Sequence, residues 1–285
     1  MINTFLFPSD YFNKNKVDSS LYAEYITCKE INETHIILFS YRKWFEDKII
    51  ELTSIPTKNT VVIYRGWMMT PEVYEKFYAT LKAYNITLIN DPIAYNLMHI
   101  FPNVYKSIQA DTAKILTFSL HKPIDLNIIK NNGINKFLVK DYVKSVKGSN
   151  FPSSFRVDMS QEEFDGWMKV FYQYRGNLLT GGICIKEFLN LKHYGDKTNE
   201  YRVYYANNKI CSISKNSGQG YLTPLPPEEL IQKYANLQSS YYTIDYAQLE
   251  DNSWIIIECG DGQVSGLSDS QDYVDYYKNL ILCFE

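Results

Sequence analysis

The sequence of 285 residues lacks the features that mark several common classes of protein. It has no run of about 20 apolar residues, which a membrane-spanning helix requires. Its start, MINTFLFPSD, lacks the basic residues and the long apolar run of a secretion signal. It has no run of basic residues, and its net charge is -3, so neither nucleic acid nor a membrane is an expected partner. These absences predict a cytoplasmic protein.

The sequence also lacks the motifs of several enzyme classes. Its five cysteines are odd in number and widely spaced without a C-x-x-C pair, which argues against a disulfide scaffold or a zinc site. Its four histidines have neither ligand-like spacing nor a neighbouring nucleophile motif. A G-x-S-x-G elbow, a P-loop and a G-x-G-x-x-G fingerprint are all absent. Whatever chemistry the chain performs therefore rests on other groups.

Apolar periodicity predicts an α/β domain followed by an α+β region. Residues 1–110 alternate short buried strands with helices, one of which begins at Thr70-Pro71-Glu72, and this order is typical of a parallel sheet. Residues 111–180 predict a compact α+β subdomain, in which a helix begins with the capping box of Ser160 and Glu163. Residues 181–285 are rich in predicted strands, as the unusual number of tyrosines, 25, also favours.

The best local evidence for a site comes from the predicted hairpin 242–258. If Asp251 and Asn252 form a two-residue turn, Asp245 lies directly opposite Glu258, about 5 Å away. Two carboxylates held together among apolar residues need a cation or a shared proton. Oxygen ligands without His or Cys suit magnesium. The alternatives are an edge hairpin with two exposed acids, or a pair that a nearby Lys or Arg neutralises.

Basic side chains supply candidates for phosphate binding. Lys140 and Lys144 fall on one face of an extended strand, and the small basic stretch Ser145–Ser149 could cover a phosphate, although a solvated strand face is the alternative. Arg202 lies two residues after Glu200, on the same face of a predicted strand, where the two could also simply pair with each other or face solvent. Arg65 follows a strand at the edge where α/β sheets bind ligands, so it could hold an anion or simply lie at the surface.

A glycine-dense segment, ECGDGQVSGL, follows the predicted metal ligands directly. Its three glycines indicate either a close approach of the backbone to a ligand or a tight connection.

In their order, these segments resemble the ATP-grasp superfamily over residues 111–285, with residues 1–110 in the place of the α/β domain that precedes the ATP-grasp fold. The order is FLVKDYVKS, GGICIKEFLNL, EYRVYY and then IDYAQLEDNSWIIIECGDGQVSGL. The segments RGWM, VKDYVKS, E-x-R and E-x-G-D-G-Q-V-S-G-L are similar to the clade named for its arginine and lysine signature. The resemblance implies a pre-ATP-grasp domain (1–110), a small lid subdomain (111–180) and a C-terminal subdomain with an antiparallel sheet (181–285).

The resemblance also implies a role for each matching residue. Lys140 would contact the nucleotide phosphates with Lys144 nearby, and Arg202 would face the γ-phosphate or an acyl-phosphate. Asp245 and Glu258 match the two magnesium carboxylates. Where the family often has Asn as third ligand, this chain has Gly260, and Asp261 is the expected substitute. The remaining nucleotide-binding residues would be Lys186, Glu187, Phe188 and Leu189 of the strand linking the subdomains, together with Glu200. Lys106 and Lys114 are both possible as the lysine that precedes the small subdomain.

The implied activity is ligation of a carboxylate to an amine through an acyl-phosphate, with ATP and Mg²⁺, and with an amino acid, peptide or small metabolite as substrate. Arg65 is the residue we choose to hold the substrate carboxylate. Such chemistry needs positioning and charge neutralisation more than a protein nucleophile. Two alternatives stand beside it: a phosphotransferase on the same fold, and a nucleotide-binding module without turnover. The sequence leaves the oligomeric state open.

Overall fold

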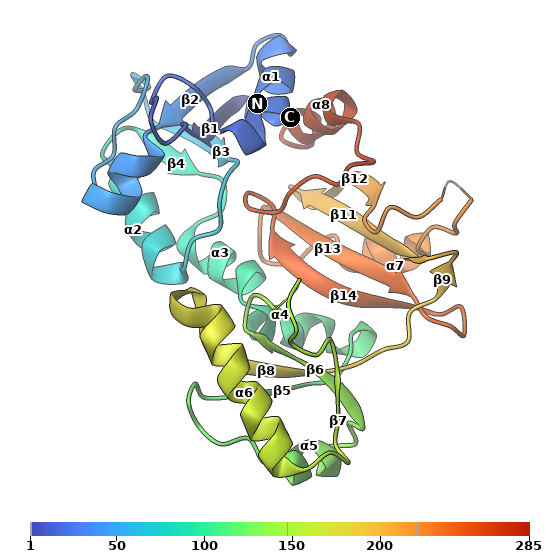
Figure 1. Ribbon diagram of the computed structural model, residues 1–285. Helices are drawn as coiled ribbons and strands as arrows, with labels where there is room; N and C mark the ends of the chain where they lie inside the picture. Colours follow the sequence, from blue (N-terminus) through green and yellow to red (C-terminus); the bar gives the residue numbers. More distant parts are fainter. Residues whose placement is uncertain (1, 147, 221) are drawn as a thin grey trace.

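The structure is a computed structural model that describes residues 2–146, 148–220 and 222–285. This part of the chain contains three four-stranded sheets and one two-stranded ribbon (Figure 1). Lys147, which belongs to the predicted phosphate-covering stretch, lies outside the described residues. The combination of a parallel α/β sheet with antiparallel α+β sheets is the fold class predicted from the sequence.

The N-terminal sheet is parallel throughout and has the order β2-β1-β3-β4. Its central strand β1 is buried along its whole length, as an uninterrupted apolar run predicts. Thr70 begins α2 as predicted, because its side chain accepts a hydrogen bond from the backbone N–H of Val73. The elements are β1 (Thr4–Pro8), α1 (Tyr22–Glu30), β2 (His35–Phe39), β3 (Thr60–Tyr64), α2 (Pro71–Lys82) and β4 (Ile86–Leu88).

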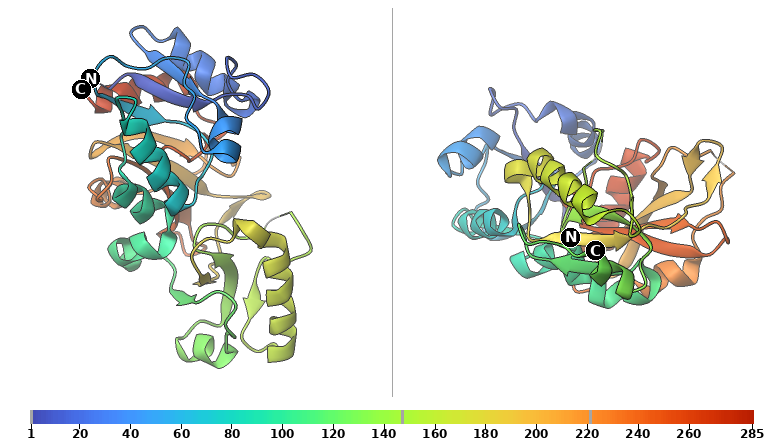
Figure 2. Two further views of the ribbon diagram at one scale, coloured as in Figure 1. Left: turned by 90° about the vertical axis from the view of Figure 1, so that its left-hand side faces the viewer. Right: turned by 60° about the horizontal axis from the view of Figure 1, so that its bottom comes forward.

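The second sheet is antiparallel, with the order β5-β8-β6-β7, and forms a subdomain that we call the lid. The lid extends away from the other two four-stranded sheets, with α6 along one side of it (Figure 1 and the left view of Figure 2). Ser160 caps α6 as predicted. The lid contains β5 (Ile115–Phe118), α5 (Leu126–Asn131), β6 (Lys136–Asp141), β7 (Phe155–Arg156), α6 (Gln161–Arg175) and β8 (Ile183–Glu187).

The C-terminal sheet is antiparallel and has the order β12-β11-β13-β14. Its apolar face packs against α3 and α4 through a core that includes Met98, Phe101 and Ile256. The elements of this part are β11 (Glu200–Ala206), β12 (Lys209–Lys215), α7 (Glu228–Lys233), β13 (Tyr241–Gln248), β14 (Trp254–Asp261) and α8 (Tyr273–Cys283). The two covering helices are α3 (Pro92–His99) and α4 (Phe101–Ile108). A two-stranded ribbon, β9 (His193–Tyr194) and β10 (Lys197–Thr198), comes between the lid and β11.

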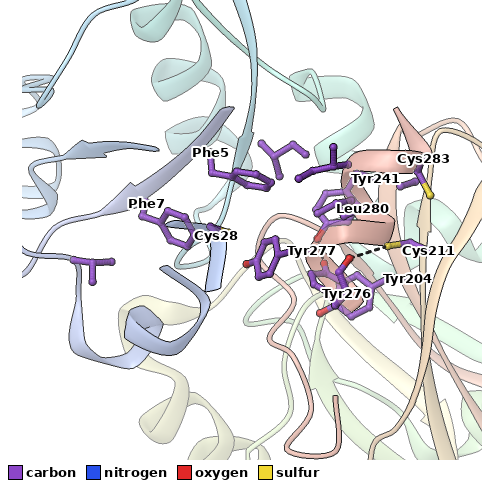
Figure 3. Close-up of a cluster of buried hydrophobic side chains, with 14 of the residues drawn as sticks. Phe5, Phe7, Cys28, Tyr204, Cys211, Tyr241, Tyr276, Tyr277, Leu280 and Cys283 are labelled. Atoms are coloured by element: carbon purple, nitrogen blue, oxygen red, sulfur yellow. Dashed lines mark hydrogen bonds between the residues drawn. The ribbon is translucent and has the colours of Figure 1, made fainter. Parts of the chain in front are cut away.

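Several elements pack across the boundaries expected at residues 110 and 180. α3 and α4 come before residue 110 but cover the C-terminal sheet. β8 follows residue 180 but pairs inside the lid. α8, at the end of the chain, lies beside α1. There Tyr277 packs on Phe5 of the N-terminal sheet, with ring centres 5.4 Å apart, while Tyr276 packs on Tyr204 of the C-terminal sheet, with ring centres 4.9 Å apart (Figure 3). These contacts fix the N-terminal and C-terminal sheets against each other.

The hairpin of β13 and β14 has the predicted pairing, with Asp245 directly opposite Glu258. The turn is one residue longer than predicted, since the backbone N–H of Leu249 donates to the carbonyl of Ser253 at 2.8 Å. A β-bulge at Ile257 restores the register, because Tyr246 pairs with Ile256 while Asp245 pairs with Glu258. Within the described residues, no helix is both long and apolar enough to cross a membrane.

Candidate functional site

Three charged side chains form a row across the C-terminal sheet. Arg202 on β11 pairs with Asp245 on β13, which pairs with Glu258 on β14, so that all three side chains lie on one face. The Arg202 guanidinium binds the Asp245 carboxylate with both ends, Nε to Oδ1 at 2.8 Å and Nη2 to Oδ2 at 2.7 Å. Burial opposes the charge on Arg202, but Asp245 outweighs this effect and raises the pKa of the guanidinium.

Two lysines of the lid extend the row across the cleft. Lys140 lies on β6 and Lys186 on β8, and both are buried over the ring of Phe101, their Nζ atoms 5.2 Å and 4.1 Å from its centre. Lys140 Nζ donates to Glu258 Oε2 at 2.9 Å and to Oε1 at 3.1 Å. Lys186 Nζ donates to the carbonyl oxygen of Ile257, the bulged residue of β14. The bulge therefore supplies a contact point for the lid.

The lysines and Glu258 set one another's ionisation. Reduced contact with water favours the neutral acid, but the charges of Lys140 and Lys186 hold the pKa of Glu258 below its ordinary value. Burial lowers the pKa of Lys186 to about 8. Burial also acts on Lys140, but the adjacent Glu258 carboxylate raises its pKa overall. Glu258 is thus an anion held between cations, and the neutralisation by a nearby Lys or Arg that the sequence offered as an alternative is present.

The loop after β6 is held in shape by Asp141, a residue for which the sequence analysis predicted no role. Its carboxylate is completely buried and accepts hydrogen bonds from the backbone N–H groups of Val143 at 2.7 Å and Lys144 at 2.6 Å. Arg175, at the end of α6, binds the same carboxylate through Nε at 2.9 Å and Nη2 at 2.6 Å. The loop turns back so that Lys144 lines the cleft together with Asp245 and Glu258.

The segment that links lid and C-terminal sheet follows directly after Lys186. The backbone N–H groups of Glu187 and Phe188 donate to the carbonyls of Lys114 and Lys136, both at 2.9 Å. Across residues 2–146, 148–220 and 222–285, the backbone N–H of Leu189 has no hydrogen-bond acceptor. Of the two lysines that the sequence left open, Lys114 adjoins this segment.

Lys106, the other of those two, is exposed on α4. Glu200 lies on the same face of β11 as Arg202 and accepts a hydrogen bond from the Thr198 hydroxyl, outside the cleft.

Arg65 requires a correction, because the structure buries it away from any substrate. Its side chain is 2% exposed, and its Nε donates to Glu24 Oε2 at 2.8 Å. Its Nη1 donates to the carbonyl of Gly262, and the hydroxyl of Tyr277 donates to the same Glu24 carboxylate. A buried cation that is already paired has no free face for a substrate carboxylate. Arg65 instead joins the N-terminal sheet to the C-terminal part of the chain.

Asp261 also requires a correction. It pairs with Tyr242, so its side chain leaves β14 on the face opposite to Glu258. There its carboxylate is fully buried and accepts hydrogen bonds from Asn90 Nδ2 at 2.6 Å and from Gln263. Burial raises its pKa to about 6. Asp261 therefore holds the loop after β14 against the N-terminal sheet and does not join the carboxylate pair.

The glycine-dense segment is a tight connection. A Cβ on Gly262 would lie 2.7 Å from the ring of Tyr241, so only glycine fits this close approach.

A histidine that the sequence analysis passed over also belongs to the cleft. His99, the last residue of α3, lines the cleft with Lys144, Arg202 and the carboxylate pair. Residue spacing provided no signal for it, because its position depends on the packing of α3 against β14 and the loop after β6.

The cleft around these residues has a volume of about 100 Å³. Larger hollows, of about 630 and 710 Å³, lie at the β4 edge and at the start of the N-terminal strands, but the described residues that line them include no cluster of ionisable side chains. The chemistry is therefore concentrated in the smaller cleft. This volume is smaller than the roughly 300 Å³ or more of clefts that enclose a small-molecule ligand.

Known proteins provide a comparison for this geometry. Residues 131–280 match a family described as an ATP-grasp domain, the third family of the clade that is named for its arginine and lysine signature. No curated protein matches the sequence.

Solved structures resemble the whole chain. D-alanyl-alanine synthetase A from Vibrio cholerae O1 biovar eltor is 12% identical, with a TM-score of 0.60 over 99% of this chain and 97% of its own. D-cycloserine synthetase DcsG is 10% identical, with a TM-score of 0.61 over 99% of this chain and 100% of its own. The ATP-grasp ligase PsnB, solved with minimal precursor, Mg and ADP, is 10% identical, with a TM-score of 0.60 over 99% and 97%. At these identities the resemblance is one of fold.

Proposed function

The chain belongs to this third ATP-grasp domain family of the arginine and lysine clade and has the fold of ATP-grasp ligases, and from this premise we propose that it joins a carboxylic acid to an amine in a reaction that consumes ATP and requires magnesium. The observation that carries the proposal is the row Arg202–Asp245–Glu258, which Lys140 connects to the lid. Here cations that can bind phosphate flank two adjacent carboxylates that can bind a metal.

In this proposal ATP lies between the lid and the C-terminal sheet. Its adenine would meet the linking segment Glu187–Leu189, where Leu189 still has a backbone N–H to donate within the described part of the chain. Its phosphates would replace Glu258 as the partner of Lys140, with Lys186 beside them and Lys144 at the mouth of the cleft. Arg202 would exchange part of its contact with Asp245 for the transferred phosphoryl group.

The donor set fits magnesium as the metal. Asp245 and Glu258 would hold the ion, and both offer only oxygen ligands. In the described part of the chain no group of three or more His, Cys, Asp or Glu side chains could hold a metal. Magnesium commonly binds through one or two carboxylates and completes its shell with phosphate oxygens and water, so two ligands suffice. When bound, the ion would neutralise charge on the phosphates.

The proposed reaction has two steps. A carboxylate oxygen of the acid attacks the γ-phosphorus, the bond from that phosphorus to the bridging oxygen breaks, and ADP leaves. The amine nitrogen then attacks the acyl carbon, the bond from that carbon to the phosphate oxygen breaks, and an amide and inorganic phosphate form. Lys140, Lys186 and Arg202 would hold the negative charge that develops. Amino acids, peptides and small metabolites are the proposed substrates, and the cytoplasm is the proposed compartment.

The test combines purified protein with ATP, Mg²⁺ and a panel of amino acids and peptides, and measures ADP release and product mass. We expect ADP release that needs both an acid and magnesium, and a product with the mass of an amide. Asp245→Asn and Glu258→Gln should abolish the release. Glu250→Gln and Asp251→Asn, in the exposed turn of the same hairpin, serve as matched controls and should retain it.

Two outcomes count against the proposal. A product that has gained only a phosphoryl group would identify a phosphotransferase. Full activity in both cleft variants would exclude the carboxylate pair as the metal site.

A further inference from the structure

Among the described residues, His99 is the one histidine that lines the cleft, and neighbouring aromatic rings fix its orientation. Its side chain is 7% exposed and stacks on the ring of Tyr95, with the ring centres 4.8 Å apart. Tyr95 stacks in turn on Tyr74, with the ring centres 3.8 Å apart. The Tyr95 hydroxyl accepts a hydrogen bond from the backbone N–H of Met69 at 3.0 Å and donates one to the Met69 carbonyl at 2.8 Å. The imidazole is thus held through one face while it lines the cleft.

The ring nitrogens of His99 have no hydrogen-bond partner in the part of the chain that the structure describes. Within the described residues these nitrogens are not among the unpartnered side-chain atoms that are shielded from solvent, so they open onto the cleft, where a ligand can reach them. The stack on Tyr95 explains how the ring keeps its place without such a bond.

The other ionisable groups that line the cleft already have roles in the proposed function. Lys144 and Arg202 are cations and face the phosphates in the proposed function, whereas Asp245 and Glu258 are the proposed metal ligands. Burial, together with the charges of Lys144 and Lys140, lowers the pKa of His99 to about 4, against the opposite effect of Glu258. His99 is therefore a neutral imidazole with one lone pair available among positively charged neighbours.

We propose that His99 receives the amine substrate: its free ring nitrogen accepts a hydrogen bond from the amine N–H and takes that proton as the C–N bond forms. This inference rests on the proposed ligase function. The amine nitrogen gives its electron pair to the acyl carbon, the acyl–phosphate bond breaks, and phosphate leaves with the bonding pair. The proton held by His99 then passes to the departing phosphate, so the imidazole returns to its neutral form. His99 has no part in the first step, in which no proton is transferred.

Separating the two steps tests this role. Hydroxylamine is small and neutral near pH 7.5, and it captures an acyl-phosphate as a hydroxamate without needing a base. The rates of hydroxamate formation and of amide formation are measured for the wild-type protein and for His99→Gln, with the acid and amine that the substrate panel identifies. We expect amide formation to fall by about 100-fold, the size of a lost general base, and hydroxamate formation to stay within about threefold.

The matched control is His121→Gln. His121 also stacks on a tyrosine, Tyr172, with ring centres 4.5 Å apart, but it is exposed on the lid. This variant should retain both rates. Equal losses of hydroxamate and amide in His99→Gln would place His99 in phosphoryl transfer or in folding and would overturn the assignment, as would an unchanged amide rate. If the wild-type protein forms no hydroxamate with any acid, the ligase function itself fails, and this role fails with it.

Discussion

The buried ion pair of Arg175 and Asp141 permits a quantitative test of how the lid is held. Replacing Arg175 with Met keeps most of the aliphatic packing and removes the charge from an Asp141 carboxylate that is 0% exposed. The same carboxylate shapes the loop that brings Lys144 to the cleft. The variant should therefore affect both lid stability and ATP binding.

The magnitude follows from the contacts that remain. Removing one partner of a buried pair destabilises a protein by about 3–5 kcal/mol, because the other charge stays buried and unpaired. Asp141 would still accept the backbone N–H groups of Val143, Lys144 and, at 3.4 Å, Thr180. These three donors partly stabilise the anion, so we expect the low end, about 3 kcal/mol.

The assay is urea unfolding of the full chain, with hydrogen exchange to localise the change to the lid. Arg156→Met provides the control, because Arg156 also binds an aspartate of the lid, Asp158, at 2.7 Å, but its side chain is 70% exposed. This control should leave the unfolding midpoint unchanged, as exposed pairs contribute little. Equal effects of the two substitutions, or no effect of Arg175→Met, would refute the reasoning from burial.

Three further predictions concern the charged groups of the cleft and the loop behind it. Asp245→Asn and Glu258→Gln should each weaken magnesium-dependent ATP binding by about tenfold or more. The affinity for ATP in EDTA, without magnesium, should stay at the wild-type value, and calorimetry can measure both affinities. Lys140→Met should shift two affinities in opposite directions, tightening Mg²⁺ binding without ATP because Glu258 loses its competing cation, and weakening ATP binding. Asp261, whose pKa burial raises to about 6, contributes stability when protonated that is lost as the pH rises through this value. Between pH 4.5 and 8, wild-type protein should therefore lose about 2 kcal/mol more than Asp261→Asn in urea unfolding.

The carboxylate pair shows what the sequence can predict about this site. Alternating apolar residues and turn-forming Asp251 and Asn252 were sufficient to place Asp245 opposite Glu258. The prediction succeeded although the turn is longer than assumed, because the bulge at Ile257 compensates for the extra residue. The agreement therefore depended on two departures that cancel, the longer turn and the bulge. A single sequence gives little indication of a bulge, so neither departure could be predicted.

Arg65 and Asp261 show where such prediction stops. Arg65 was assigned a ligand because it follows a strand end, and Asp261 because it follows the position where the family often has Asn. Each is instead bound by residues far away in the chain. Glu24 lies 41 residues before Arg65, and Asn90 lies 171 residues before Asp261. Whether a charged side chain faces a ligand or a buried partner depends on these tertiary contacts, which local pattern does not contain. The position of His99 was hidden for the same reason.

The contacts that close the cleft are made by groups that the proposed ligands need. Lys140 binds Glu258, and Lys186 binds the carbonyl of Ile257, so both lysines pull the lid onto the C-terminal sheet. Asp245 is likewise neutralised by Arg202. Magnesium and ATP would therefore have to exchange partners with the protein together: the ion takes the carboxylates while the phosphates take the cations. Either ligand alone would leave buried charges of one sign unpaired. Binding of Mg²⁺ and ATP should consequently be strongly cooperative, with the lid closing again only when both are present.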